Sequence, residues 1–196
     1  MGKTTLAVDV MIHRLMRGVR RCFAVCPTWY QQPTLGPLRA IKDAFPRPHV
    51  FTQVNDQVFQ HIFNICDRDK QPTLVFLDDA AAEAATNKGN KGTFARLSLA
   101  CNHLNISMVG IFQRLTQAST AFRDNAEGII SFIPSKTLDV ETIHDEFNPC
   151  PANMRSREVV KNNLQLAWDT ARFCFIHREA FTGKIRYFSG FQQEIK

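Results

Sequence analysis

Residues 73–79 read TLVFLDD, a threonine and four apolar residues followed by two adjacent carboxylates. A short apolar run without polar alternation is typical of a strand buried on both faces, as in a parallel sheet covered by helices. Ligands of such sheets bind beyond the carboxyl ends of the strands. The stretch predicts that Asp78 and Asp79 lie at a ligand-binding edge, where Asp78 can hold Mg²⁺ and Asp79 can orient and deprotonate water. The alternative is that the two carboxylates only mark the end of a strand.

The chain opens MGKTTLAVDV, and its residues 2–4 match the second half of the phosphate-binding loop G-x-x-x-x-G-K-[ST]. Backbone N–H groups at a helix start favour phosphate, Lys3 adds a positive charge, and the Thr4 hydroxyl can ligate Mg²⁺. A plain helix start is the alternative, because these residue types are common. We expect the first half of the loop and its strand to lie upstream of Met1, so that MGKTT is an internal stretch of the native protein.

Helix and strand patterns alternate along the rest of the chain. Helical spacing of apolar residues predicts helices, and short apolar runs or a flanked Thr-Gly turn predict strands. The predicted helices are 3–17, 38–45, 54–67, 94–103, 119–125, 138–147 and 157–170, and the predicted strands are 21–26, 50–51, 73–77, 106–112, 128–133, 172–177 and 184–189. The predicted fold class is α/β, with a mainly parallel sheet covered by helices on both faces, a first strand missing through N-terminal truncation, and a C-terminal β-hairpin.

Composition limits the class of protein. At 196 residues and 44% hydrophobic content, we expect a single domain, with a nucleotide-binding core over residues 1–135 and an αβ extension over residues 136–196. No apolar stretch approaches the roughly 20 residues that span a membrane, and no signal-peptide pattern opens the chain. Six cysteines without CxxC pairs indicate free thiols in a reducing compartment. We therefore expect an intracellular protein with no membrane partner.

Positive charge gathers at the two ends of the chain. The net charge is +6, and residues 1–50 carry eight Lys or Arg against two Asp or Glu. Residues 51–150 carry eight against twelve, and residues 151–196 carry eight against four. This distribution favours a polyanionic partner, although a merely solvated basic face explains the charge equally well. The polar loop at 86–92 contains Lys88 and Lys91 and is a candidate contact for that partner, with disorder without function as its alternative.

Two further polar residues are candidates for the same site. Gln113 follows the predicted strand 106–112, where a side-chain amide can hydrogen-bond both a γ-phosphate and the lytic water. Many strands end on glutamine for no catalytic reason. Arg123 lies in STAFRDN at 119–125 and can reach phosphate oxygens, across a subunit interface as an arginine finger. A salt-bridged surface arginine is the alternative.

These elements together resemble the genome-packaging ATPases of poxvirus-like and related double-stranded DNA viruses, including virophages. That group is a branch of the FtsK–HerA superfamily of P-loop NTPases. The resemblance runs over residues 2–133 and is carried by GKTT at 2–5, CPTW at 26–29, LVFLDD at 74–79, NHLNISM at 102–108, Gln113 and STAFRDN at 119–125.

The resemblance implies an ATPase that uses ATP and Mg²⁺. Its Walker A residues are Gly2, Lys3, Thr4 and Thr5, and its Walker B residues are Asp78 for the metal, together with Thr4, and Asp79 for water activation. Gln113 is then the sensor and Arg123 a trans-acting arginine. Two positions depart from relatives: Asn102 stands where many carry arginine, and Asp79 where many superfamily members carry glutamate.

The resemblance also implies a homo-oligomeric ring around double-stranded DNA that drives the DNA into a preformed capsid, with a capsid or portal-vertex protein as a further partner. Lys88 and Lys91 then face the DNA. The expected location is the virus factory of an infected cell, and the virion. Three alternatives stay open: a cellular DNA-pumping or conjugation-type ATPase of the same superfamily, a P-loop kinase or small-molecule transferase, and a truncated, non-hydrolysing virion protein.

Overall fold

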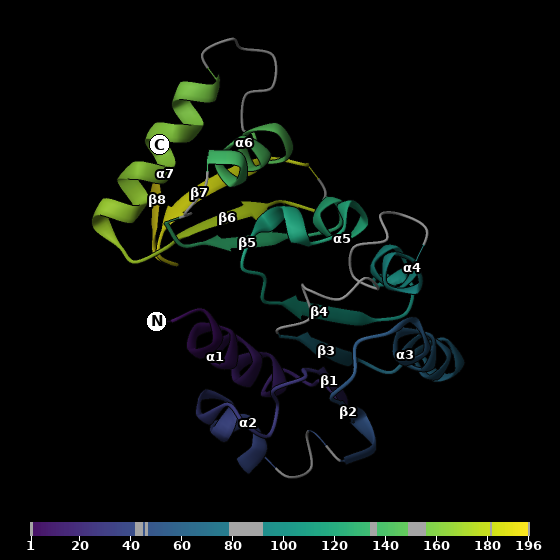
Figure 1. Cartoon of the computed structure of the whole chain (residues 1–196). Helices are drawn as coiled ribbons and strands as arrows, with labels where there is room; N and C mark the ends of the chain where they lie inside the picture. Colours follow the sequence, from purple (N-terminus) through teal and green to yellow (C-terminus); the bar gives the residue numbers. More distant parts are fainter. Residues whose placement is uncertain are drawn as a thin grey trace. The chain divides into compact units, whose positions relative to one another are not determined.

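The computed structural model describes residues 2–41, 45, 47–78, 92–133, 137–148, 156–180 and 182–195. The chain divides into two compact units, Met1–Gln113 with Gln117–Arg123, and Arg114–Thr116 with Asp124–Lys196 (Figure 1). Each unit has its own sheet and its own hydrophobic core. None of the helices in the described ranges is long and apolar enough to cross a bilayer.

The first unit is built on a four-stranded parallel sheet. Its strands run in the order β2-β1-β3-β4 and are joined by helical connections. The elements are α1 (Lys3–Leu15), β1 (Arg21–Val25), α2 (Gly36–Ala40), β2 (Val50–Phe51), α3 (Asp56–Asp69), β3 (Thr73–Leu77), α4 (Thr93–Ala100), β4 (Ile106–Gly110) and α5 (Thr120–Asp124). This parallel sheet with helices, together with a C-terminal hairpin, confirms the predicted α/β fold class.

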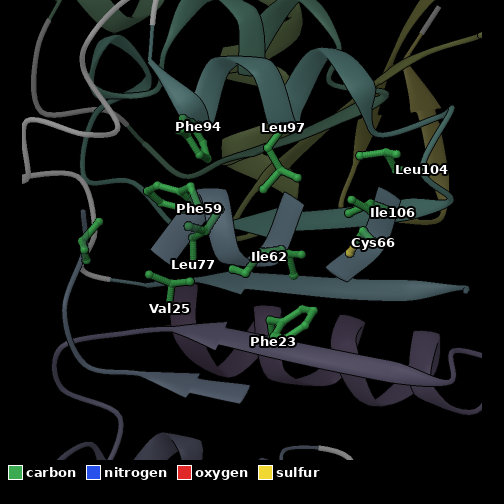
Figure 2. Close-up of a cluster of buried hydrophobic side chains, with 12 residues drawn as sticks. Phe23, Val25, Phe59, Ile62, Cys66, Leu77, Phe94, Leu97, Leu104 and Ile106 are labelled. Atoms are coloured by element: carbon green, nitrogen blue, oxygen red, sulfur yellow. The ribbon is translucent and has the colours of Figure 1, made fainter. Parts of the chain in front are cut away.

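Both faces of the parallel sheet are buried. Alternate residues of β1 enter different cores: Phe23 and Val25 pack under α3 and α4, whereas Cys22 and Ala24 pack under α1. Figure 2 shows the first of these cores, with Phe59 of α3 and its neighbours on β3, β4 and α4. A strand buried on both sides needs apolar residues at every position, which explains the uninterrupted runs in the sequence. Each fully buried Phe or Leu contributes about 1.5–3 kcal/mol of transfer free energy.

Local signals set the ends of α3. The side chain of Asn55 accepts a hydrogen bond from the Val58 N–H at 3.0 Å and so caps the helix start. Lys70 ends the helix in the left-handed conformation, with a φ of 49°. The helix predicted over residues 38–45 differs more. It occupies Gly36–Ala40 after a 3₁₀ helix over Pro33–Leu35, because Pro33 and Pro37 suit first-turn positions.

The second unit is an antiparallel sheet covered by two helices. Its strands run in the order β5-β6-β7-β8. The elements are β5 (Gly128–Ser131), α6 (Thr137–Glu146), α7 (Ser156–Thr170), β6 (Cys174–Arg178), β7 (Ile185–Ser189) and β8 (Gln193–Ile195). The predicted hairpin is confirmed as β6 and β7, in which Phe175 lies opposite Phe188. The strand β8 was not predicted from its polar sequence, and β5 pairs with β6 rather than with a parallel strand.

Close packing holds the second unit together. The buried Tyr187 hydroxyl donates to the Phe147 carbonyl at 2.7 Å, and burial raises the pKa of this phenol. The Arg178 guanidinium lies 4.3 Å from the centre of the Phe147 ring and donates to the Glu146 carbonyl at 2.8 Å. A β-carbon on Gly128 would lie 2.8 Å from the Phe175 ring, so a side chain at this position would have to displace that ring.

Candidate nucleotide-binding site

The carboxyl ends of the parallel strands lie in register at one edge of the sheet. Val25, Leu77 and Gly110 pair across β1, β3 and β4. The ladder of backbone hydrogen bonds continues for one more residue. The Asp78 N–H donates to the Val25 carbonyl at 3.2 Å, and the Ile111 N–H donates to the Leu77 carbonyl at 2.9 Å. The Asp78 residue, at 2% exposure, is therefore held by the sheet itself at the edge where parallel α/β sheets bind ligands.

The start of α1 lies at the same edge. The Lys3 ammonium donates to the carbonyl of Phe112 at 3.3 Å and to the carbonyl of Gln113 at 3.4 Å, directly beyond β4. Gly2 precedes the helix with a φ of 147°, a conformation that favours glycine, and none of the described side chains caps the first turn. The first N–H groups of a helix have no partner within the helix, so this end of α1 suits an anion.

The structure brings some of the predicted site residues together. Lys3 and Gln113 are in contact, and Asp78 follows the strand next to β4. Thr4 and Thr5 occupy the first turn of α1, half-buried and exposed respectively. The contact between Lys3 and Gln113 uses the backbone carbonyl of Gln113. The side chain of Gln113 is exposed. Predictions made for Asp79, Lys88 and Lys91 lie outside the described residues.

Arg123 is occupied with the backbone of its own segment. Its guanidinium donates to the carbonyl of Ala118, and its backbone N–H donates to the Ser119 carbonyl at 3.1 Å. The neighbouring Phe122 ring lies 5.5 Å from the Phe112 ring. The helix α5 is thereby tied to the segment that holds Lys3, and the role of Arg123 toward phosphate stays a prediction.

Sequence reasoning missed the backbone part of the site. The carbonyls of Phe112 and Gln113 hold Lys3, and main-chain atoms leave no signature in a sequence. Cys26 and Thr28, which follow β1 at the same edge, were given no role. The Cys26 sulfur lies 3.6 Å from the Thr28 hydroxyl oxygen, and the Cys26 N–H donates to Phe51 at 2.9 Å. Their position after a buried strand was the available signal.

The residues present fit a magnesium ion held with a nucleotide. Among the described residues, no group of three or more His, Cys, Asp or Glu is arranged to hold a metal. Mg²⁺ in nucleotide sites takes one or two carboxylates and phosphate oxygens rather than a full protein cage. A buried carboxylate, Asp78, at the edge where α1 begins with Lys3 and Thr4 supplies the hard oxygen ligands for such a site.

Burial disfavours thiol chemistry at four cysteines of the described chain. Burial raises the pKa of Cys22, Cys101 and Cys174 to about 12, so these thiols stay protonated at neutral pH. Burial also raises the pKa of Cys66. A protonated, buried thiol is neither a good nucleophile nor a good metal ligand.

No protein-family model matches the sequence, and no curated protein matches it. Solved structures do match. The genome-packaging NTPase B204 of Sulfolobus turreted icosahedral virus 2, in complex with sulfate, superposes with a TM-score of 0.59, covering 95% of this chain and 90% of that chain at 11% identity. Its complex with ATP-γS gives a TM-score of 0.57 over the same shares at 14% identity.

The DNA-packaging ATPase B204 of Sulfolobus turreted icosahedral virus gives a TM-score of 0.58, covering 92% of this chain and 85% of that chain at 13% identity. Similarity at this level of identity is similarity of fold. The chain has the fold of a viral genome-packaging NTPase.

Proposed function

We propose that this chain is an ATPase of viral genome packaging. The observation that carries the proposal is the position of Lys3, at the first turn of α1 and in contact with the segment after β4, at the sheet edge where Asp78 is buried. A phosphate-binding lysine and a magnesium carboxylate have to meet at one edge of the sheet. The likeness in fold to B204 supports the same assignment.

Each residue of the site has a chemical task in this proposal. The N–H groups at the start of α1 bind the β- and γ-phosphates, and the Lys3 ammonium exchanges its carbonyl partners for phosphate oxygens. Thr4 and Asp78 hold Mg²⁺, which supplies charge neutralisation on the phosphates when bound. Asp79 takes the proton of the attacking water, and the Gln113 amide orients that water.

The proposal extends to the biological role expected from the sequence. We assign the chain to the poxvirus-like and virophage-type packaging ATPases within the FtsK–HerA superfamily, as a homo-oligomeric ring that translocates double-stranded DNA into a capsid in the virus factory. Arg123 acts on the nucleotide of a neighbouring subunit, a capsid or portal-vertex protein receives the ring, and Lys88 and Lys91 contact DNA phosphates. Contacts of that kind are independent of sequence and sensitive to salt.

ATP hydrolysis tests the proposal directly. We expect Lys3→Ala and Asp78→Asn to lower the hydrolysis rate at least about 100-fold, the loss typical of removing one preorganised charge from a transition state. Lys161→Ala and Asp169→Asn are matched controls on the exposed face of α7 and should leave the rate unchanged. Circular dichroism checks that each variant is folded.

The outcomes separate the alternatives. Normal turnover in Lys3→Ala contradicts the proposed site. A folded wild-type chain that binds no nucleotide favours a non-hydrolysing virion protein. Phosphoryl transfer to a soluble acceptor, with no stimulation by DNA, favours a kinase or transferase. A capsid gene beside this gene separates a viral packaging motor from a cellular DNA pump.

A further inference from the structure

Three turns lie side by side at the amino ends of the parallel strands. The Arg20 N–H donates to the Pro72 carbonyl at 2.9 Å, and the Thr73 N–H donates to the Asn105 carbonyl at 3.0 Å. These bonds join three segments, residues 13–21, 67–73 and 101–105, which lead from α1, α3 and α4 into β1, β3 and β4 (Figure 1). This edge is opposite the one that holds Asp78. Along α1, Lys3 and Arg14 are separated by about 16 Å.

The three turns carry an excess of positive charge. They contain six Lys or Arg and two carboxylates, Asp67 and Asp69. Asp69 is already paired, because the Arg21 guanidinium contacts its two oxygens at 2.7 and 2.8 Å. The exposed cations that remain form what we call the amino-edge surface, namely Arg14, Arg17, Arg20, Arg68 and Lys70.

Helix ends account for only part of this surface. Arg14 and Arg68 lie in the last turns of α1 and α3, where a cation complements the helix dipole. Arg17 and Arg20 lie beyond the end of α1 and have no such explanation. Within the described ranges, neither guanidinium forms an ion pair with a carboxylate. Two arginines of this cationic surface are therefore exposed, and no ion pair within the described part of the chain accounts for them.

We propose that the amino-edge surface binds the phosphate backbone of double-stranded DNA, an inference that rests on the proposed function. Four of its five cations are arginines, whose planar guanidinium matches phosphate oxygens with two parallel hydrogen bonds. Hot spots of protein interfaces are enriched in tryptophan and tyrosine as well as arginine, and residues 13–21, 67–73 and 101–105 contain no tryptophan, tyrosine or phenylalanine. Because the surface lies at the opposite edge from Lys3, DNA and nucleotide bind at the same time.

The test measures binding of the full chain to a labelled duplex of arbitrary sequence by fluorescence anisotropy, over a range of salt concentrations. The variant is Arg14→Gln/Arg17→Gln/Arg20→Gln. The matched control removes the same charge from exposed positions of the second unit, as Arg157→Gln/Lys161→Gln/Arg172→Gln. We expect the amino-edge variant to bind at least about 10-fold more weakly at 0.1 M salt, with the slope of log K against log salt reduced by up to about 2.7.

A charge-preserving variant, Arg14→Lys/Arg17→Lys/Arg20→Lys, should keep the wild-type salt slope, which separates lost phosphate contacts from damage to the fold. Three results overturn the inference: no duplex binding by the wild-type chain, an equal loss in the control variant, or competition by polyglutamate as effective as that by unlabelled duplex. The last result assigns the surface to an acidic protein partner.

Hydrolysis of ATP without DNA, measured on the same proteins, keeps the two proposals separate. The amino-edge variant should hydrolyse ATP at the wild-type rate, because its three positions lie at the far end of α1. If the amino-edge variant loses duplex binding but the wild-type chain hydrolyses no ATP, the DNA-binding surface is supported and the proposed ATPase function is wrong. If the wild-type chain hydrolyses ATP but the amino-edge variant binds the duplex as tightly as the wild type does, the ATPase function is supported and the DNA-binding surface is wrong.

Discussion

Replacing one leucine of α4 tests how this helix packs on the sheet. Leu97 is fully buried among Phe59, Phe94 and the strand residues of the first core, whereas Leu99, two positions later, is 54% exposed. Leu97→Ala removes buried methyl groups and leaves a cavity that the close-packed core fills only in part. The free energy of unfolding should therefore fall by about 2–5 kcal/mol.

Leu99→Ala is the matched control, because it makes the same chemical change on the same helix. Surface substitutions of this kind change the free energy of unfolding by about 0.5 kcal/mol or less. For a chain of this length, 1 kcal/mol shifts the melting temperature by about 2–4 °C. We expect Leu97→Ala to melt at least about 4 °C below the wild type and Leu99→Ala within about 2 °C of it.

Thermal unfolding followed by circular dichroism measures both shifts, and urea unfolding gives the free energies. A larger loss from Leu99→Ala, or equal losses from the two variants, would refute the packing of α4 described above. The contrast matters for function, because α4 packs in the same core as β3, and Asp78 directly follows the last residue of that strand.

Three further predictions concern glycine packing, ion pairing and thiols. Gly110→Ala should lower the melting temperature, because the new β-carbon would lie 2.6 Å from the Phe112 ring. Gly36→Ala is the control and should not lower it, because the nearest atom to its β-carbon lies 3.9 Å away. Equal melting temperatures of the two variants would contradict this packing. The Arg21 guanidinium lowers the pKa of Asp69 to about 2, below its value in the unfolded chain, so this pair stabilises the fold fully above about pH 4 and loses its effect as the pH falls toward 2. Acid unfolding of Asp69→Asn should lack this component, and an unchanged acid transition would show that the pair does not form. Cys22 and Cys174 should resist alkylation by iodoacetamide in the native protein and react after unfolding, as read by mass spectrometry, and rapid native labelling of either would contradict their burial.

Strands buried on both faces were predictable from the sequence, because every position of such a strand is apolar. β1 and β3 are examples, and their predicted ranges match the structure to within one residue. The pairing of β5 with β6 was not predictable in this way, since it joins residues 128–131 to residues 174–178 and local pattern carries no information about distant partners. β8 is short and mostly polar, so periodicity gave no strand signal.

The candidate site follows the same division. The positions of Lys3 at a helix start and of Asp78 after a buried strand were predictable from local patterns, and their roles toward a nucleotide stay a prediction. The contact between Lys3 and the carbonyls beyond β4 spans more than one hundred residues and uses main-chain atoms, so it required the structure. The amino-edge surface likewise arises from turns that are distant in the sequence.

The most direct test of the nucleotide site is the reactivity of Lys3 toward an amine-specific acylating reagent, read by mass spectrometry with and without Mg·ATP. Lys3 is exposed, as are Lys70 at the opposite edge and Lys161 on α7, so all three should react in the free protein. Mg·ATP should protect Lys3 and leave Lys70 and Lys161 unchanged. Equal labelling of Lys3 with and without saturating Mg·ATP would contradict the assignment of this sheet edge as the nucleotide-binding site.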